Sequence, residues 1–317
     1  MREGENAPGG GLWNELRTRL SRGPRLRLPG ARPEARVHII TDTASALPEG
    51  YSDEHAEVLS VVPMPVTVDA QVFIEGVDDV MSELSLGLAM GSKITTSRPA
   101  PGQLLRAVER AAEAGASSVL IVCISSALSG TVDAARWAAE QAQLPVRVLD
   151  TRSVGLGEGF AVMAAVEAAE AGLELDEVHL AAAAACDASV WFVVPSLEQL
   201  RRGGRIGAVA SVLGTLLNVK PILTVNRDGA IVAADKARSL QRALAHVIEL
   251  GIDAAGEDPA GVRVGLHHFG AEEEAAAVAE ALAPYTEHPV LVTPVPAVLA
   301  AHTGAGVVAL IVRRDRD

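Results

Sequence analysis

Four hydroxyl side chains and one glycine fall within the seven residues from 125 to 131, where Ser129 and Gly130 precede Thr131. The apolar run 119–124 before them is typical of a strand buried on both faces, and the Ala-rich run 131–143 predicts a helix. Ser129 therefore lies near the start of a helix, where unbonded N–H groups and the helix dipole favour a carboxylate or a phosphate. The segment predicts an oxyanion-binding turn, and the simpler alternative is a serine that only caps the helix.

Three further segments concentrate polar side chains in the same way. They contain Thr96-Ser97-Arg98 within residues 94–99, Arg205 after Gly203-Gly204, and His302-Thr303 before a Gly-rich run. Each could serve structure alone, because Pro99 would stop an extended run, paired glycines permit a positive φ, and a histidine can be a core residue. Together they offer hydroxyl donors, a fixed cation and an imidazole, with no carboxylate paired to the histidine. Such a set suits holding an anionic head group better than cleaving a bond.

Other chemistries compete with this interpretation. An acyl-transfer hydrolase would use Ser129 as nucleophile and His302 as base, but Ser129 lacks the Gly-x-Ser-x-Gly surroundings of a nucleophile elbow. A metal enzyme would use His267 and His268, although neighbours on a strand point to opposite faces. The Gly-rich run 155–159 suggests a dinucleotide fingerprint, but Phe160 stands where its third glycine is needed, so a tight strand-to-helix turn is expected.

Composition sets wider limits. The 317 residues suffice for two domains of ordinary size, and with 49% apolar but 3% aromatic residues the cores must consist of Ala, Val and Leu. The formal net charge is −13, although residues 1–36 carry +4 from eight Arg and four Glu, which leaves −17 for the remainder. A body this acidic argues against nucleic acid as a partner.

Cysteine usage and hydropathy predict the compartment. Cys123 and Cys186 lie far apart in the sequence, predict no disulfide framework and fit a reducing cytoplasm. No signal peptide and no uncharged apolar run of about 18 residues is visible, so we expect a cytoplasmic protein without stable membrane insertion. Residues 1–35 are rich in Arg, Gly and Pro and predict a mobile extension; contact of its Arg-rich part with an acidic partner or a membrane surface is the alternative.

From residue 37 onward, segments typical of strands alternate with segments typical of helices. Strands are predicted at 37–40, within 58–68, and at 119–124, 146–149, 190–194, 229–234, 262–266, 290–293 and 307–312, and helices at 81–90, 104–114, 131–143, within 160–185, and at 239–250 and 272–282. The pattern predicts an α/β protein with two domains, residues 36–186 around a mostly parallel sheet and residues 187–317 around a mixed sheet. Asp42, residues 125–129 and Asp150 follow strands of the first domain, at the edge where open α/β sheets bind ligands.

The sequence resembles the DegV family from about residue 37 to residue 312. The resemblance rests on seven segments in the same order, at residues 40–45, 96–99, 125–131, 148–153, 197–206, 217–222 and 302–306. Any one of them is a weak signal, whereas seven in order are specific. DegV proteins are bacterial fatty-acid-binding proteins and include the lipid-binding subunits of fatty acid kinase. The resemblance therefore implies two α/β domains with a ligand slot between them.

The resemblance also implies roles for individual residues. A long-chain fatty acid is expected in the slot, its carboxylate held by Thr96 and Ser129, with Arg205 and His302 at the same end. Supporting positions around this head-group site are Ser97, Ser126, Gly130 and Thr303. Kinase-coupled members present the carboxylate to a separate ATP-dependent kinase. The resemblance thus implies a binding protein rather than an enzyme, with a fatty acid as ligand and without cofactor or metal.

Two residues near these positions depart from the family pattern. Arg98 stands where family members commonly have Gln, and Gly207 stands where Ser is usual. Arg98 adds a cation beside Thr96 and could retune the head-group pocket or form a surface ion pair. The Arg-rich extension has no counterpart in the family pattern.

Overall fold

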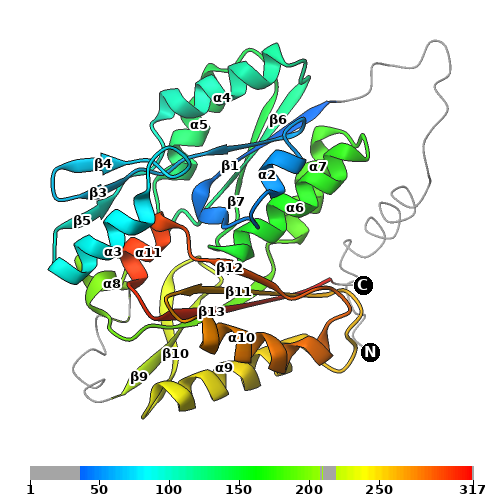
Figure 1. The fold of residues 1–317 in the computed structure, drawn as a ribbon. Helices are drawn as coiled ribbons and strands as arrows, with labels where there is room; N and C mark the ends of the chain where they lie inside the picture. Colours follow the sequence, from blue (N-terminus) through cyan, green and yellow to red (C-terminus); the bar gives the residue numbers. More distant parts are fainter. Residues whose placement is uncertain (1–35, 208, 210–218, 316–317) are drawn as a thin grey trace, which may run out of the picture.

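The computed structural model describes residues 36–207, 209 and 219–315. The predicted extension of residues 1–35, and residues 217 and 218 of one family-like segment, lie outside this part. Two large sheets and the helices on their faces are stacked in layers (Figure 1). Among the described helices, none is both long enough and apolar enough to span a bilayer.

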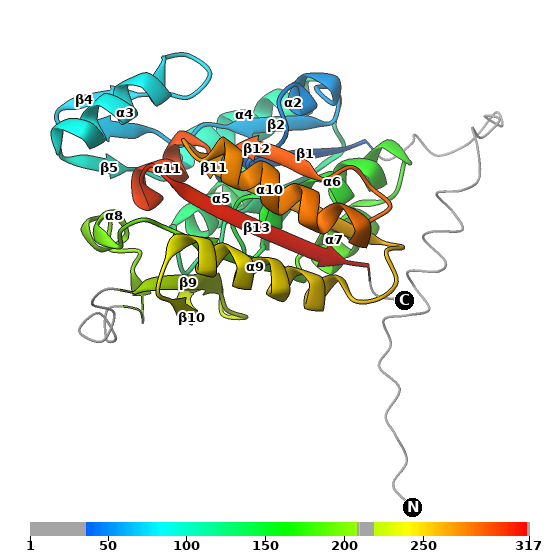
Figure 2. The same cartoon turned by 60° about the horizontal axis from the view of Figure 1, so that its bottom comes forward.

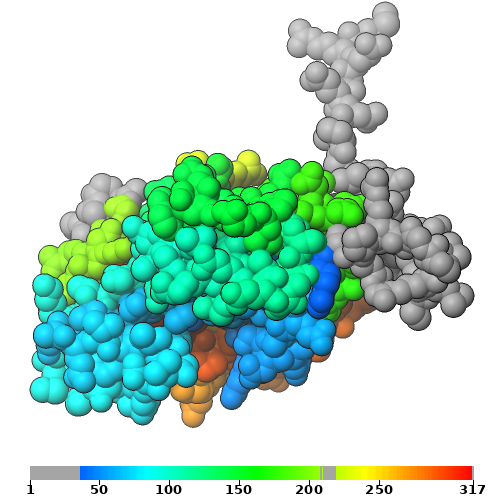
Figure 3. All heavy atoms as spheres, turned by 90° about the horizontal axis from the view of Figure 1, so that it is seen from above, coloured from blue at the N-terminus to red at the C-terminus, as the bar shows by residue number. Residues whose placement is uncertain are grey.

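A four-stranded parallel sheet comes first in the chain. Its strands are β2 (Leu59–Val62), β1 (Val37–Asp42), β6 (Ser118–Cys123) and β7 (Val146–Asp150), in that spatial order. Every residue of β1 and β6 is buried, as expected for central strands covered on both faces. Helices α4 (Pro101–Glu113) and α5 (Thr131–Gln141) cover the face seen in Figure 3, and α6 (Leu156–Glu170) and α7 (Leu175–Ala184) cover the other. The predicted parallel sheet is confirmed.

A six-stranded mixed sheet follows, as predicted. Its spatial order is β10 (Ile231–Ala237), β9 (Lys220–Val225), β8 (Ala188–Val193), β13 (Val307–Arg314), β11 (Val262–Phe269) and β12 (Leu291–Pro294). The β11–β12 pair is parallel, and the other four neighbouring pairs are antiparallel. Helices α9 (Leu240–Ala255) and α10 (Glu272–Leu282) cover the outer face of this sheet (Figure 2).

Helix α6 lies between the two sheets and packs on both. It contacts β1 and β6 on one side and β8 and β13 on the other. Twelve of its 15 residues are buried, because small and apolar side chains occupy most of its surface, and the exposed exceptions are Glu167 and Glu170. The Gly-rich run forms its start, with Gly155 as N-cap, so the expected strand-to-helix turn is confirmed and the helix begins earlier than predicted. The predicted domain boundary after residue 186 falls just before β8 and stays a prediction.

Several short elements were not predicted. Residues 58–68, expected to be strand-like, contribute β2 to the parallel sheet and β3 (Val66–Val68) to a separate antiparallel sheet with β4 (Gln71–Phe73) and β5 (Ile94–Thr96). The long helix beside this small sheet is the predicted one, α3 (Val80–Met90). Short helices occur at α2 (Tyr51–Glu54), α8 (Glu198–Arg202) and α11 (Ala297–Thr303), and single 3₁₀ turns at Thr43–Ser45 and Ala283–Tyr285. Elements this short carry little periodicity for a sequence pattern to reveal.

Candidate functional site

A cavity lies between the parallel sheet and the mixed sheet. Its wall is formed by residues that follow β6 and β7, by residues of β8, β10 and β13, and by α11. Its volume is about 850 Å³, including space that opens to solvent.

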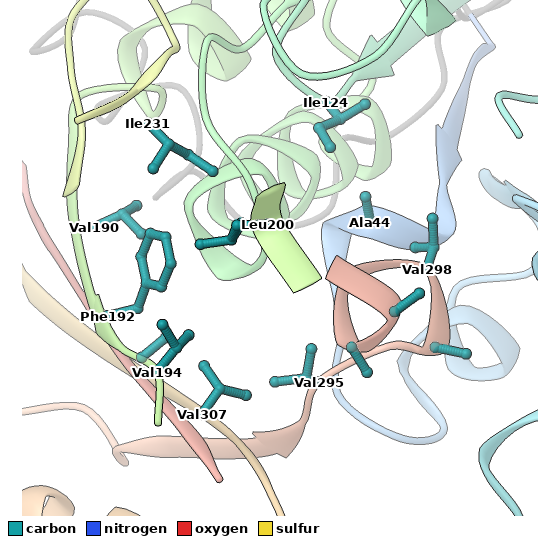
Figure 4. Packing of buried hydrophobic residues seen from close by; sticks show 14 of the residues in the cluster. Ala44, Ile124, Val190, Phe192, Val194, Leu200, Ile231, Val295, Val298 and Val307 are labelled. Carbon is teal, nitrogen blue, oxygen red and sulfur yellow. The ribbon is translucent and has the colours of Figure 1, made fainter. Parts of the chain in front are cut away.

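Most of the cavity wall is apolar. Alternate residues of two neighbouring strands face it, namely Val190 and Phe192 of β8 and Val307, Ala309 and Ile311 of β13. Figure 4 shows side chains from several elements around the same space, among them Val190, Phe192, Ile231, Ile124, Leu200, Val298, Val295 and Val307. A wall of this kind suits an alkyl chain, which gains free energy in proportion to the apolar area removed from water.

Polar lining residues meet where α11 approaches β5. The Thr96 hydroxyl, on the last residue of β5, lies 2.8 Å from Nε2 of His302 on α11. This bond joins residues 206 positions apart in the chain. Thr303 also lines the cavity, and its hydroxyl donates to the Leu299 carbonyl within α11. The structure thus brings together the polar segment around Thr96 and the polar segment around His302.

The Ser-rich turn contributes the second hydroxyl of this end. Ser129 lines the cavity and is 9% exposed, and its hydroxyl lies 2.9 Å from the Thr131 hydroxyl. Gly130, rather than Ser129, is the N-cap residue of α5, and no side chain caps this helix. Ser129 therefore stands one residue before the cap, so the capping role considered as its simpler alternative is not the one observed.

Two guanidinium groups flank this turn. Arg205 donates from Nε to the Leu128 carbonyl at 3.1 Å and from Nη1 to the Gly203 carbonyl at 2.6 Å. The Arg98 side chain lies against Gly130, since a Cβ atom placed on that glycine would be 3.1 Å from Arg98 Cδ. Both arginines line the cavity. The polar segment that contains Arg205 therefore lies at the same end of the cavity as Thr96, Ser129 and His302.

The imidazole of His302 is neutral at physiological pH. Burial, and to a smaller extent the nearby Arg205 charge, lower its pKa from 6.5 to about 4. Its position also depends on Gly203, because a Cβ atom there would lie 2.0 Å from His302 Nδ1. Gly204, in contrast, has open space around its Cα and a positive φ of 73°. Of the two glycines expected to permit a positive φ, Gly204 does so, and Gly203 is needed for a close approach.

Two carboxylates that were expected at the ligand-binding edge hold the Ser-rich turn instead. Asp150 accepts from the Ser126 hydroxyl at 2.5 Å and from its backbone N–H at 3.1 Å. Asp42 accepts from the Ile124 N–H at 3.3 Å, and burial raises the pKa of its carboxyl to about 7. Neither side chain belongs to the described cavity wall. Their role in this geometry is to fix the backbone that carries Ser129.

A third acidic side chain lies on α6 behind the same strand ends. Glu158 is fully buried, and one of its oxygens accepts from the Thr41 hydroxyl at 3.2 Å. Its other oxygen has no hydrogen-bond partner within the described residues. Burial, together with the Asp42 charge, raises the pKa of Glu158 well above its ordinary value. Burial at this position therefore favours the protonated form of Glu158.

The two adjacent histidines of β11 point to opposite faces, as expected for a strand. His267 is buried and lines the cavity, with Nε2 accepting from the Leu156 N–H at 2.8 Å and Nδ1 2.7 Å from the Thr293 hydroxyl. His268 instead lies 3.7 Å from a Glu272 carboxylate oxygen. Over residues 36–207, 209 and 219–315, no three His, Cys, Asp or Glu side chains form a group that could hold a metal ion.

The structure places the other predicted site residues less centrally. Ser97 is exposed, and Ser97, Ser126 and Gly130 do not belong to the described cavity wall. The hydrolase alternative requires a bond between Ser129 and His302, but the hydrogen bonds found for the described residues pair these side chains with Thr131 and Thr96. Thr131 and Gly203 were not predicted as site residues. Thr131 contacts the Ser129 side chain, and Gly203 contacts the His302 side chain. The order of residues in the sequence does not reveal such contacts.

Known proteins are similar to this one along nearly the whole chain. Residues 36–315 match the model of a family described as uncharacterised proteins of the DegV family. A DegV domain-containing protein of Streptomyces coelicolor is 37% identical over 279 residues, which cover 87% of this chain and 98% of the relative. A DegV domain-containing protein of Mycobacterium tuberculosis is 40% identical over 282 residues, which cover 87% and 96%.

Solved structures show the same fold. A DegV family protein from Thermus thermophilus, described by its fatty acid binding, superposes with a TM-score of 0.82 at 32% identity and covers 88% of this chain and 99% of its own. DegV from Bacillus subtilis, described as a fatty acid binding protein, gives a TM-score of 0.77 at 26% identity and covers 88% and 99%.

Proposed function

The chain belongs to the DegV family, and we propose that it binds a long-chain fatty acid in the cavity between its two sheets. The carboxylate lies at the polar end beside Thr96 and Ser129, and the alkyl chain lies along the apolar wall. The observation that carries the proposal is this asymmetry, because polar side chains from four separate segments converge at one end of a cavity whose remaining wall is apolar except for His267. The fatty acid binding of the Thermus and Bacillus relatives supports it.

The hydrogen bonds around the two hydroxyls specify how they donate. A hydroxyl has one proton, so Thr96 can donate to a carboxylate only if its oxygen accepts from His302. This requirement places the imidazole proton on Nε2 of the neutral His302 ring. In the same way, Thr131 must donate to Ser129 to free the Ser129 proton for the ligand. His302 and Thr131 are thus positioning residues that act through the two hydroxyls.

The alkyl chain and the head group contribute differently to affinity. Burying about 14 methylenes at ~0.8 kcal/mol each gives roughly 11 kcal/mol of gross driving force, against association costs of ~4–15 kcal/mol. A hydrogen bond to a charged carboxylate contributes about 1.5–3 kcal/mol. The chain therefore decides whether a lipid binds, and Thr96 and Ser129 decide which of its ends lies at the polar end.

The proposal includes presentation of the carboxylate to a separate ATP-dependent fatty acid kinase in the cytoplasm. Two α/β domains, residues 36–186 and 187–317, would hold the lipid between them and supply no catalytic group of their own. The position of Arg205, which contacts both the Ser129 turn and the end of α8, supports a role at the presented end. The 317-residue sequence also contains no Walker-type phosphate loop, so the nucleotide would be bound by the partner.

Binding is tested first on the purified protein. Native mass spectrometry after bacterial expression should detect a retained fatty acid of about 14–18 carbons, and delipidated protein should take up palmitate. Thr96→Ala and Ser129→Ala should each weaken palmitate binding by about 1–3 kcal/mol, with a less than additive double mutant because both donate to one carboxylate. Thr95→Ala is the matched control, since Thr95 is the exposed neighbour on β5. Absence of bound lipid and of palmitate uptake would refute the function.

Kinase presentation needs a separate assay. With a purified fatty acid kinase and ATP, Arg205→Ala and His302→Ala should lose acyl phosphate formation while the protein still carries lipid. Equal turnover by both variants and the wild type would remove the presentation role and leave the binding role intact.

A further inference from the structure

The polar end of the cavity carries more positive charge than a carboxylate needs. Arg205 holds the carbonyl of Leu128, the residue before Ser129, and Arg98 lies across Gly130, the residue after it. Ser129 is thus flanked by two guanidinium groups, both on the cavity wall. One guanidinium suffices to match the single charge and two oxygens of a carboxylate.

Neither guanidinium is neutralised by the part of the protein that the structure describes. The hydrogen bonds of Arg98 and Arg205 go to backbone carbonyl groups of Pro99, Leu128 and Gly203. None of the described cavity-lining residues is acidic. The ion pairs found among described residues involve other arginines, for example Arg147 with Asp176 and Arg202 with Glu198. In a chain with a net charge of −13, two arginines at a cavity that have no carboxylate partner among the described residues indicate an anionic ligand.

We propose that this end of the cavity binds a phosphate head group on a single alkyl chain more tightly than it binds a carboxylate, with Arg98 as the residue that adds the preference. The inference rests on the proposed function, because it assumes that the alkyl chain occupies the apolar wall. A phosphate monoester carries about −1.5 to −2 charge at neutral pH and has three strong acceptor oxygens. The two guanidinium groups and the Thr96 and Ser129 hydroxyls together provide donors for all three.

Arginine is suited to this role by its shape. A guanidinium presents its N–H groups in a planar fork that matches phosphate oxygens and stays charged at every physiological pH. Arg98 is exposed, however, so water and salt screen its charge. The preference should therefore be moderate, at least about fivefold in dissociation constant, as expected for a charged contact at a solvent-facing position. It should also decrease as the salt concentration rises.

The test compares hexadecyl phosphate with palmitate by displacement of a fluorescent fatty acid from the delipidated full-length protein. At about pH 8, well above the second phosphate pKa near 6, the wild type should bind hexadecyl phosphate at least ~5-fold more tightly than palmitate. Arg98→Gln should lower this ratio towards one, and Arg98→Lys should retain part of it because the charge is kept. Arg110→Gln, which removes an exposed charge on α4 outside the described cavity wall, is the matched control and should leave the ratio unchanged. Raising the salt from about 0.05 M to about 0.5 M should reduce the wild-type ratio.

Each result bears on one of the two proposals. Palmitate binding without a preference for hexadecyl phosphate, or an Arg98→Gln variant with the full wild-type preference, overturns the phosphate inference and leaves fatty acid binding standing. Failure of both lipids to bind refutes the proposed function itself. A palmitoyl lysophosphatidate arm identifies the source of the head group. Tighter binding of hexadecyl phosphate supports a phosphate attached directly to the chain, and tighter binding of the lysophosphatidate supports a membrane-derived lipid.

Discussion

Replacing Gly203 with alanine should disrupt the head-group site without straining the backbone. Gly203 has an ordinary negative φ of −76°, which alanine adopts freely. Its new Cβ atom would lie 2.0 Å from His302 Nδ1 and 3.2 Å from the Gln199 carbonyl oxygen. The imidazole must retreat by about 1.4 Å to restore normal contact. A displacement of this size would disrupt the geometry of the 2.8 Å hydrogen bond between His302 and Thr96.

The expected cost follows from the role of Thr96. Once His302 no longer fixes its orientation, Thr96 loses a hydrogen bond to the charged carboxylate, which contributes about 1.5–3 kcal/mol. Palmitate affinity should then fall roughly 10- to 150-fold. Isothermal titration calorimetry with palmitate measures this loss, and thermal unfolding of the same sample measures stability.

Gly204→Ala provides the opposite perturbation at the next residue. It meets no atom within 4 Å but forces alanine to a φ of 73°, so it should cost about 1 kcal/mol of stability and leave palmitate affinity unchanged. If Gly203→Ala acts through His302, the double mutant with His302→Ala should bind no more weakly than His302→Ala alone. Wild-type affinity in Gly203→Ala, or additive losses in the double mutant, would refute the reasoning.

Two further predictions concern buried polar groups behind the site. Because the pKa of Glu158 is raised, the folded protein keeps this proton above pH 4.5 whereas the unfolded chain releases it, so the stability that the protonated acid contributes is lost as pH rises. Glu158→Gln has no proton to release, so its melting temperature should rise relative to that of the wild type from pH 5 to pH 8. A difference in melting temperature that stays constant over this range would contradict the raised pKa. Ser125→Ala removes the hydroxyl that donates to the Gly229 carbonyl at 2.8 Å. The free energy of unfolding measured by urea titration should fall by about 1–3 kcal/mol. A change near zero would mean that water replaces this hydrogen bond.

The sequence predicted the long elements well because their patterns are local. Strand β6 is buried at six consecutive residues, and helix α10, whose predicted bounds of 272–282 match Glu272–Leu282, buries Ala275, Val278 and Leu282 at helical spacing. Strand β5 and helices α8 and α11 have three, five and seven residues, too few for a period to emerge. Their positions are set by packing against distant parts of the chain.

The same distinction applies to the site. The polar segments around Thr96, Ser129, Arg205 and His302 could be selected from residue types and from the family resemblance, and all four line one cavity. The bond between Thr96 and His302 could not be predicted, because 206 residues separate its partners. Nor could the role of Gly203, since it depends on a side chain that the fold brings against it.

Helix α6 has a consequence for how the protein unfolds. Apart from the exposed Glu167 and Glu170, this helix has little surface in contact with water, and its apolar side chains complete the packing of β1 on one side and of β13 on the other. Neither sheet can therefore separate from the other without exposing α6, and loss of either sheet removes support from its neighbour. The two sheets should behave as one cooperative unit, with Trp137 on α5, beside the parallel sheet, and Trp191 on β8, in the mixed sheet, reporting the same transition.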